Sequence, residues 1–168
     1  TFPVATHAQP SCDDPPPPFD NPDLLANWQT VWDKTDICIS IENVFTDEEQ
    51  PIMSGGVPRD GIPPIDNPTF DEQSIADLWL QAQSPVIAVD VEGVARAYPL
   101  AILTRHEIVN DVIGETAIAV TYCPLCNSAV VYDRTVDGNI LRFGVSGFLR
   151  NSDLIMWDDL TQSWWQQF

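Results

Sequence analysis

The most regular feature of the chain is an alternation of apolar and polar residues that begins near position 85 and predicts short β-strands. Pro85–Asp90 and Val94–Tyr98 alternate on either side of Glu92-Gly93, which suits a tight turn, so they predict a hairpin. Asp137-Gly138 is a second turn signal of this kind. The same alternation predicts strands at Thr116–Tyr122, Asn127–Arg134, Ile140–Val145 and Leu154–Trp157.

Helix-compatible spacing is confined to short segments. Leu24–Trp32 and Ser74–Gln83 have apolar residues at helical intervals, and Leu100–Leu103 is long enough for one helical turn. Because the predicted strands outnumber the helices and are joined by short turns, we expect a compact α+β domain rich in antiparallel strands. Loops or turns are predicted at Gln50–Pro68, Asn110–Glu115 and Ser146–Asn151.

The N-terminal part of the chain has a different composition. Asp13 and Asp14 are followed by the run Pro15–Pro18, and such a segment favours extended polyproline geometry over a packed core. We therefore expect a Pro/Asp-rich tail or spacer over residues 1–27 and a single globular domain over residues 28–168.

The chain is strongly acidic, with 7 Lys and Arg against 25 Asp and Glu and a formal net charge of -18. This charge repels phosphate backbones, so we expect no nucleic-acid partner. No uninterrupted apolar stretch approaches the roughly 20 residues that span a bilayer, so no transmembrane segment is expected. The acidity suits an exposed protein, whether secreted or salt-tolerant, and the four cysteines permit disulfides in an oxidising compartment. We favour a signal peptide that has been removed and expect an extracytoplasmic location (periplasmic, cell-surface or secreted), which the family resemblance given below implies.

Cys123 and Cys126 form a CPLC motif between two predicted strands. Two cysteines at this spacing either close a redox-active disulfide or bind one metal ion through both thiolates. In thioredoxin-like proteins the motif opens a helix, whereas Asn127–Arg134 alternates as a strand, so a thioredoxin fold is not expected. The arrangement is instead similar to one knuckle of a rubredoxin or zinc ribbon.

His106 is the candidate third ligand, because the other histidine, His7, lies in the tail. Two thiolates and an imidazole suit an open site for a soft metal such as Cu, Zn or Fe. Glu107 and Asp111 are then the groups expected to orient the imidazole ring. Alternatively, Glu107, Asp111 or Met156 is the fourth ligand of the metal ion. In the alternative interpretation the cysteine pair is structural and His106 is an ordinary core histidine.

Two further groups of residues have a functional and a structural interpretation. Cys12 and Cys38 are expected to form a structural disulfide that ties the tail to the domain and contributes about 3 kcal/mol, rather than to complete the metal site. The polar residues that follow two glycines either bind a ligand such as an anion or cap backbone groups of a loop. These loop residues are Arg150, Asn151, Ser152 and Asp153.

Several motifs, in a fixed order over about residues 53–168, resemble the bacterial and archaeal domain-of-unknown-function family 3179. The resemblance implies a mostly extracytoplasmic protein and names no reaction. Domains of this family usually continue past a segment like Ser163–Gln167, so we expect the globular domain to be truncated at its C-terminal end. The motifs are Ser54–Gly56, Asp60–Pro63, Ile65–Pro68, Ala95–Leu100, His106–Asp111, Thr121–Cys126, Phe143–Gly147 and Asn151–Asp153.

Two functions from different classes follow from these observations. In the first, the protein binds a soft metal ion, or carries out thiol redox exchange, through Cys123, Cys126 and His106. In the second, it is a non-enzymatic cell-surface or extracellular assembly module with a structural cysteine pair, which contacts a partner or another copy through its N-terminal tail. No phosphate-binding glycine loop or nucleophile elbow is present, so the sequence leaves open whether the protein is an enzyme.

Overall fold

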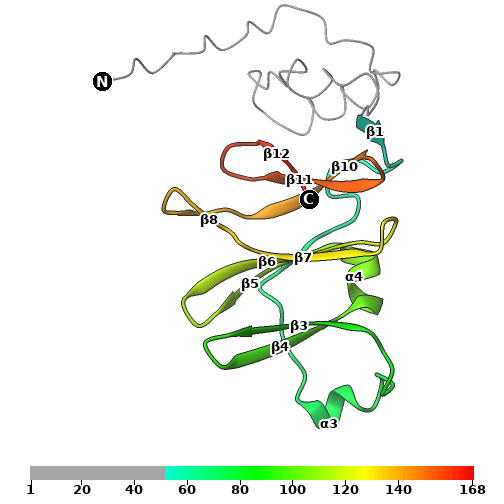
Figure 1. Ribbon diagram of the computed structural model, residues 1–168, viewed down its shortest axis with the longest axis vertical. Coiled ribbons are helices and arrows are strands. Elements are labelled where there is room, and N and C mark those ends of the chain that lie inside the picture. The colour runs from blue at the N-terminus through cyan, green and yellow to red at the C-terminus, as the bar shows by residue number, and fades with distance from the viewer. Residues whose placement is uncertain (1–51) are drawn as a thin grey trace, which may run out of the picture. The chain divides into compact units, whose positions relative to one another are not determined.

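A computed structural model describes residues 52–168, of which Met53–Phe168 form one compact unit (Figure 1). Antiparallel sheets and two short helices build this unit, which confirms the expected α+β class rich in antiparallel strands. The elements are β1 (Ile52–Ser54), β2 (Ile65–Asp66), α3 (Gln73–Ala76), β3 (Val86–Val91), β4 (Val94–Pro99), α4 (Leu100–His106), β5 (Ile108–Ile113), β6 (Thr116–Cys123), β7 (Ser128–Asp133), β8 (Thr135–Val136), β9 (Asn139–Ile140), β10 (Phe143–Arg150), β11 (Asp153–Asp158) and β12 (Trp164–Gln166).

Two four-stranded sheets pack face to face. Their strand orders are β1-β10-β11-β12 and β2-β5-β6-β7, and the short pairing of β2 with β5 is parallel. Ile108, Ala119 and Cys123 from the second sheet share one core cluster with Val145 and Met156 from the first. Cys123, the first cysteine of the CPLC motif, therefore lies in the core between the two sheets.

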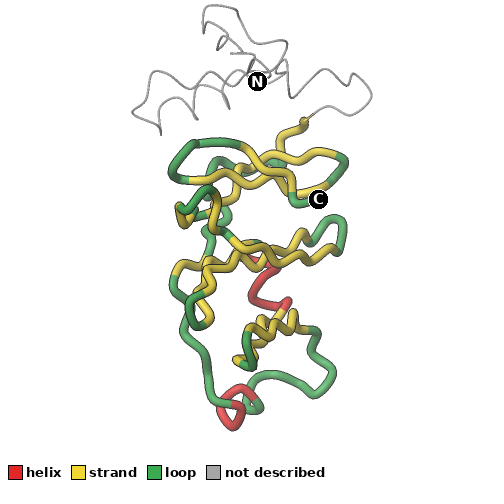
Figure 2. Tube along the Cα trace, turned by 60° about the vertical axis from the view of Figure 1, so that its left-hand side comes forward, coloured by secondary structure: helices red, strands yellow, loops and turns green. Residues whose placement is uncertain are grey.

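A hairpin and a helix cover the other face of the β2-β5-β6-β7 sheet, as Figures 1 and 2 show. Val109 and Val120 point to this side and pack with Tyr98 of β4 and Leu103 of α4 in a second cluster. Successive residues of β5 and β6 thus alternate between two cores, so both strands are buried on both faces. The predicted hairpin of Pro85–Asp90 and Val94–Tyr98 is confirmed as β3 and β4.

The predicted turn at Asn110–Glu115 is wrong, because β5 runs through most of this segment. Asn110 and Asp111 suggested a turn, yet both are buried and their side chains form hydrogen bonds. The amide of Asn110 donates to the Phe143 carbonyl at 2.8 Å and accepts from the Phe143 N–H at 2.9 Å, which links the two sheets. A buried polar residue with partners is compatible with a central strand.

The predicted loop at Ser146–Asn151 is also wrong over most of its length, because β10 extends to Arg150. Gly147 lies in this segment, where the register of the strand shifts between Val145 and Leu149. It has a φ of 84°, and a Cβ atom there would overlap the Val57 carbonyl oxygen. This glycine therefore permits both the backbone conformation and the close packing of a bulged strand.

Other boundaries differ more modestly. The helix expected over Ser74–Gln83 is shortened to α3, which has no buried residue and no side-chain cap to extend it. Conversely, α4 continues past the single turn expected at Leu100–Leu103, and β1 and β2 lie within the loop expected at Gln50–Pro68.

No helix among the described residues is long and apolar enough to cross a membrane. The expectations for Leu24–Trp32, the tail and the Cys12–Cys38 pair lie outside the described residues.

Candidate metal centre

The CPLC motif forms the connection between β6 and β7. Cys123 is the last residue of β6 and is paired with Ser128, the first residue of β7. Asn127 takes a positive φ of 50°, a conformation that asparagine tolerates, and so lets the chain reverse. Both thiols are free; Cys123 is buried and Cys126 is partly exposed.

A carboxylate from the other sheet completes a group of three donors. Asp153, the first residue of β11, places its Oδ1 3.5 Å from the Cys126 sulfur. The ligand atoms of Cys123, Cys126 and Asp153 all lie within 4.8 Å of one another. Two sulfurs in a tetrahedral zinc site lie roughly 3.8 Å apart, so only a small contraction is needed to bring the three donors around one ion.

No Lys, Arg or His among residues 52–168 forms an ion pair with this group. Asp153 is only 2 % exposed, and no ion pair between described residues involves it. Burial, with a contribution from Cys126, raises the pKa of the Cys123 thiol to about 11. A bound cation would therefore stabilise thiolates whose formation is disfavoured by burial.

A chain of hydrogen bonds orients the Ser128 hydroxyl beside Cys126. Thr121 Oγ1 donates to the Val130 carbonyl at 2.8 Å, so it accepts from the Gln167 amide at 2.9 Å. The Gln167 oxygen is then the acceptor for the Ser128 hydroxyl, at 2.7 Å. Because the single proton of that hydroxyl is directed to Gln167, its oxygen lies 3.0 Å from Cys126 Sγ as one acceptor for the thiol, and Asp153 Oδ1 at 3.5 Å is another.

The last two described residues close the site. Gln167 is fully buried, and its carbonyl accepts a short hydrogen bond from the Tyr132 hydroxyl. The N–H of Phe168 donates to Asp153 Oδ2 at 3.2 Å, which orients the carboxylate. The end of the chain thus holds both Asp153 and, through Ser128, Cys126 in place.

A family model described as a protein of unknown function (DUF3179) matches residues 59–168, a range that contains every residue of this site. The chain belongs to the DUF3179 family. This confirms the resemblance drawn from the sequence motifs. No curated protein and no solved structure is significantly similar to the chain.

His106 of this DUF3179 chain ends α4 and is not a member of the three-residue group. Its Nδ1 lies 2.7 Å from the Pro63 carbonyl, so a backbone oxygen orients the ring. The carboxylate of Asp111 faces the other core, where it pairs with Arg96 at 2.5 Å and accepts from Tyr98 at 2.6 Å. The structure therefore does not place Asp111 against the imidazole.

The four polar loop residues form a tight turn between β10 and β11. Asn151 and Ser152 both have positive φ, as in the two-residue turns that suit hairpins, and Arg150 pairs with Asp153 across the turn. The Ser152 carbonyl accepts the Cys123 thiol at 3.4 Å. This turn therefore places the Ser152 carbonyl beside Cys123 and the Asp153 carboxylate beside Cys126.

Sequence reasoning named Asp153 only as a residue of the polar loop, not as a member of the group with the cysteines, and gave no role to Ser128 and Gln167. One signal was available for Ser128, because a four-residue connection pairs it with Cys123 and puts both side chains on one face. Gln167 carries no such signal, since its contacts with Thr121 and Ser128 span 46 and 39 residues. Only the packing of the two sheets brings it to the site.

Glu107 lies directly after α4, and burial raises the pKa of its carboxyl to about 7. A carboxyl whose pKa is higher in the folded state is destabilising once it ionises, so stability falls between pH 4.5 and about 7. We expect Glu107→Gln to raise the free energy of unfolding at pH 8 by about 2 kcal/mol, allowing for partial solvent access, and to change it little at pH 4.5.

Urea unfolding of both proteins at the two pH values measures this difference. Glu115→Gln is the matched control, because Glu115 is exposed in the β5–β6 turn. Equal stabilisation by Glu107→Gln at both pH values would contradict the assignment of the effect to the buried charge.

Proposed function

We propose that this protein binds one soft metal ion, Cu, Zn or Fe, through Cys123, Cys126 and Asp153. The observation that carries the proposal is the convergence of two thiols and a buried carboxylate within 4.8 Å, from two different sheets. Thiolate donors favour these metals over Mg and Ca. Asp153 is a harder donor, and such mixed donor sets are found in zinc and iron sites.

Electrostatics supports a cation at this position. Burying a carboxylate without a positive partner is costly, and its neighbours here are two more groups that become anionic when they deprotonate. One divalent ion would offset this cost and accept all three donors. A purely structural cysteine pair gives no account of the buried Asp153 beside it.

We propose His106 as the residue that takes the fourth position. The contact of Nδ1 with the Pro63 carbonyl favours the tautomer in which Nδ1 carries the proton, which leaves the Nε2 lone pair free for a metal. The backbone next to His106 is joined to the strand that ends at Cys123, because the carbonyl of Glu107 accepts the Tyr122 N–H at 2.8 Å. Binding through Nε2 would require a movement at the end of α4.

Thiol–disulfide exchange is the second candidate. It is favoured by the pairing of a partly exposed Cys126 with a buried Cys123, and by Asp153 Oδ1 at 3.5 Å, where it can receive the thiol proton. The two thiols would lose two electrons and two protons to form a disulfide, while a disulfide in a substrate protein gains both and becomes a dithiol.

Elemental analysis of the full chain, purified without added metal, separates these functions. The metal proposal expects one equivalent of Cu, Zn or Fe, whose removal by a chelator exposes two further reactive thiols. A metal-free protein with a reversible dithiol/disulfide couple would favour exchange instead. A metal-free protein that takes up none of the three ions and whose Cys123 and Cys126 stay inert would contradict both functions and favour the assembly module.

An extracytoplasmic location is part of this proposal. It is supported by the acidic composition and by the even number of cysteines. Detection of the protein in the periplasmic, surface or secreted fraction of its native cells would support it, and detection in the cytoplasmic fraction alone would contradict it.

A further inference from the structure

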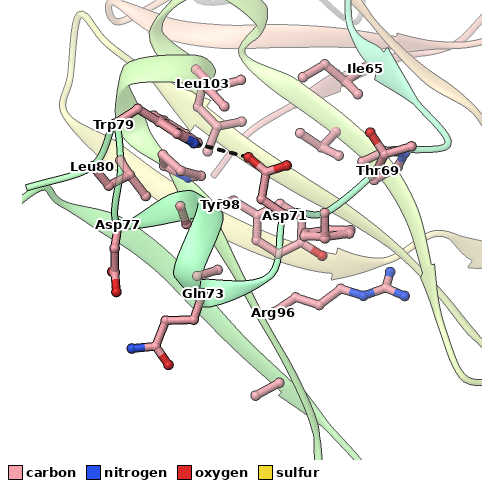
Figure 3. Close-up of a pocket in the computed structure, with 18 residues that line it drawn as sticks. Ile65, Thr69, Asp71, Gln73, Asp77, Trp79, Leu80, Arg96, Tyr98 and Leu103 are labelled. Atoms are coloured by element: carbon pink, nitrogen blue, oxygen red, sulfur yellow. Dashed lines mark hydrogen bonds between the residues drawn. The ribbon is translucent and has the colours of Figure 1, made fainter.

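A cavity of about 830 Å³ lies on the opposite face of the β2-β5-β6-β7 sheet from the metal centre (Figure 3). It is an open cavity lined by residues of β4, α4 and the segment 68–80, which includes α3. Its volume is in the range of pockets that hold small organic molecules. The site is therefore separate from the cysteines and from the function proposed for them.

The walls of the cavity are largely apolar and aromatic. Tyr98 and Leu103 contribute buried side chains, whereas Phe70 and Trp79 of the covering segment are 42 % and 48 % exposed. Phe70 packs edge-on against Tyr98, with 5.5 Å between the ring centres. The exposed indole of Trp79 offers a surface on which a ligand can pack.

The positive charge that borders the cavity is already neutralised. One nitrogen of Arg96 contacts both carboxylate oxygens of Asp111, at 2.5 and 2.6 Å, and its guanidinium lies over the Phe70 ring at 4.7 Å. The Tyr98 hydroxyl donates to the same carboxylate. Arg96 is thus part of a structural ion pair, and an anionic ligand would find no uncompensated cation there.

No ion pair between described residues neutralises the negative charge of the cavity. Figure 3 shows the Asp71 carboxylate pointing across the cavity toward Trp79, whose Nε1 donates to its Oδ2 at 3.1 Å. No ion pair between described residues includes Asp71, and its Oδ1 accepts no hydrogen bond from them. Asp77 lines the same cavity and adds a second negative charge.

We propose that this cavity binds a small organic ammonium ion with an apolar body. The ammonium group pairs with the Asp71 carboxylate and lies against the Trp79 ring, because a cation is attracted both to a carboxylate and to the face of an indole. The apolar body packs on Tyr98 and Leu103. A neutral apolar molecule would desolvate Asp71 without compensation, and an anion would be repelled by it.

Calorimetric titration of the full chain with hexyltrimethylammonium tests this proposal, with heptanol and heptanoate as neutral and anionic probes of similar size. We expect binding of the ammonium probe to exceed that of both others. Asp71→Asn should weaken it roughly ten-fold or more, since a charged partner is lost. Trp79→Leu should weaken it too, whereas Asp137→Asn, in the exposed turn between β8 and β9, should not.

Two controls show whether a change in ammonium binding comes from a loss of folding or from the metal centre. Asp71 is exposed, so Asp71→Asn is expected to unfold at the wild-type temperature. A variant with Cys123→Ser and Cys126→Ser should bind the ammonium probe as the wild type does. Equal or tighter binding of heptanol or heptanoate, no effect of Asp71→Asn, or no binding of hexyltrimethylammonium at millimolar concentration would each overturn the proposal.

Discussion

A Cys126→Ser variant of the full chain is expected to lose its metal ion. A serine hydroxyl stays protonated at neutral pH and is a hard, weak donor, so it cannot replace a thiolate toward Cu, Zn or Fe. The loss of affinity should exceed the roughly 10–100-fold effect of removing a residue that only orients a ligand. Metal content after desalting, and competition with a chromophoric chelator, measure the change.

The structure supplies graded comparisons for this variant. Leu125→Ala changes the same turn at a side chain that is 69 % exposed, so it should retain the metal. Ser128→Ala removes the hydroxyl that lies 3.0 Å from Cys126 Sγ and should show the smaller effect of an orienting residue. Asp153→Asn keeps both thiols but loses an anionic donor, so reduced affinity with an unchanged thiol count would favour metal binding over exchange.

Two results would contradict the metal centre. One is wild-type metal content in Cys126→Ser. The other is an identical loss in Cys126→Ser and Leu125→Ala, which would show that disturbance of the turn, rather than removal of a ligand, releases the ion. Circular dichroism of each variant checks that the sheets remain intact.

Local pattern was sufficient to predict the hairpins, because alternation and turn residues act over a few positions. The β3–β4 pair and the strands β6 and β7 around the CPLC motif follow from it. The pattern failed at Asn110, where a polar side chain in a central strand is satisfied by Phe143 of the other sheet. No local rule distinguishes such a residue from one in a turn.

The candidate metal centre was predictable in part for the same reason. Cys123 and Cys126 are close in sequence, so their spacing indicates a shared ion, a redox-active disulfide or a structural pair. Asp153 is 27 residues beyond Cys126 and reaches it only because β11 packs in the facing sheet. His106 is the last residue of α4, two residues before the β5–β6 pairing begins, and the position of its ring depends on how that helix ends, which alternation does not determine.

The largest loss of stability is expected from Asp158→Asn. Asp158 is fully buried at the end of β11, and its Oδ2 accepts hydrogen bonds from the Thr161 hydroxyl, the Ser163 N–H and the Trp165 indole. Its Oδ1 accepts from the Thr161 N–H at 2.6 Å. An asparagine amide in either orientation turns an N–H toward at least one of these donors and removes the charge, so we expect a loss of about 3 kcal/mol.

This loss should depend on pH in a defined direction. Burial opposes ionisation of Asp158, but the hydrogen bonds from Thr161, Trp165 and Ser163 outweigh it and lower the pKa of the carboxyl below its ordinary value of 3.8. A lowered folded-state pKa stabilises the protein above the unfolded pKa, and this contribution disappears as the pH falls through the folded value. The difference between wild type and variant should therefore be full at pH 7 and smaller at pH 3.

Urea unfolding at the two pH values measures this difference, and Asp159→Asn is the matched control. Asp159 is the exposed neighbour and accepts one backbone hydrogen bond, from Arg142 at 3.1 Å, so its replacement should cost little. Because the Asp158 network anchors β12, which leads into Gln167 and Phe168, the variant should also bind the metal less tightly. Equal stability losses in Asp158→Asn and Asp159→Asn, or a loss at Asp158 that is as large at pH 3 as at pH 7, would refute the role given to this carboxylate.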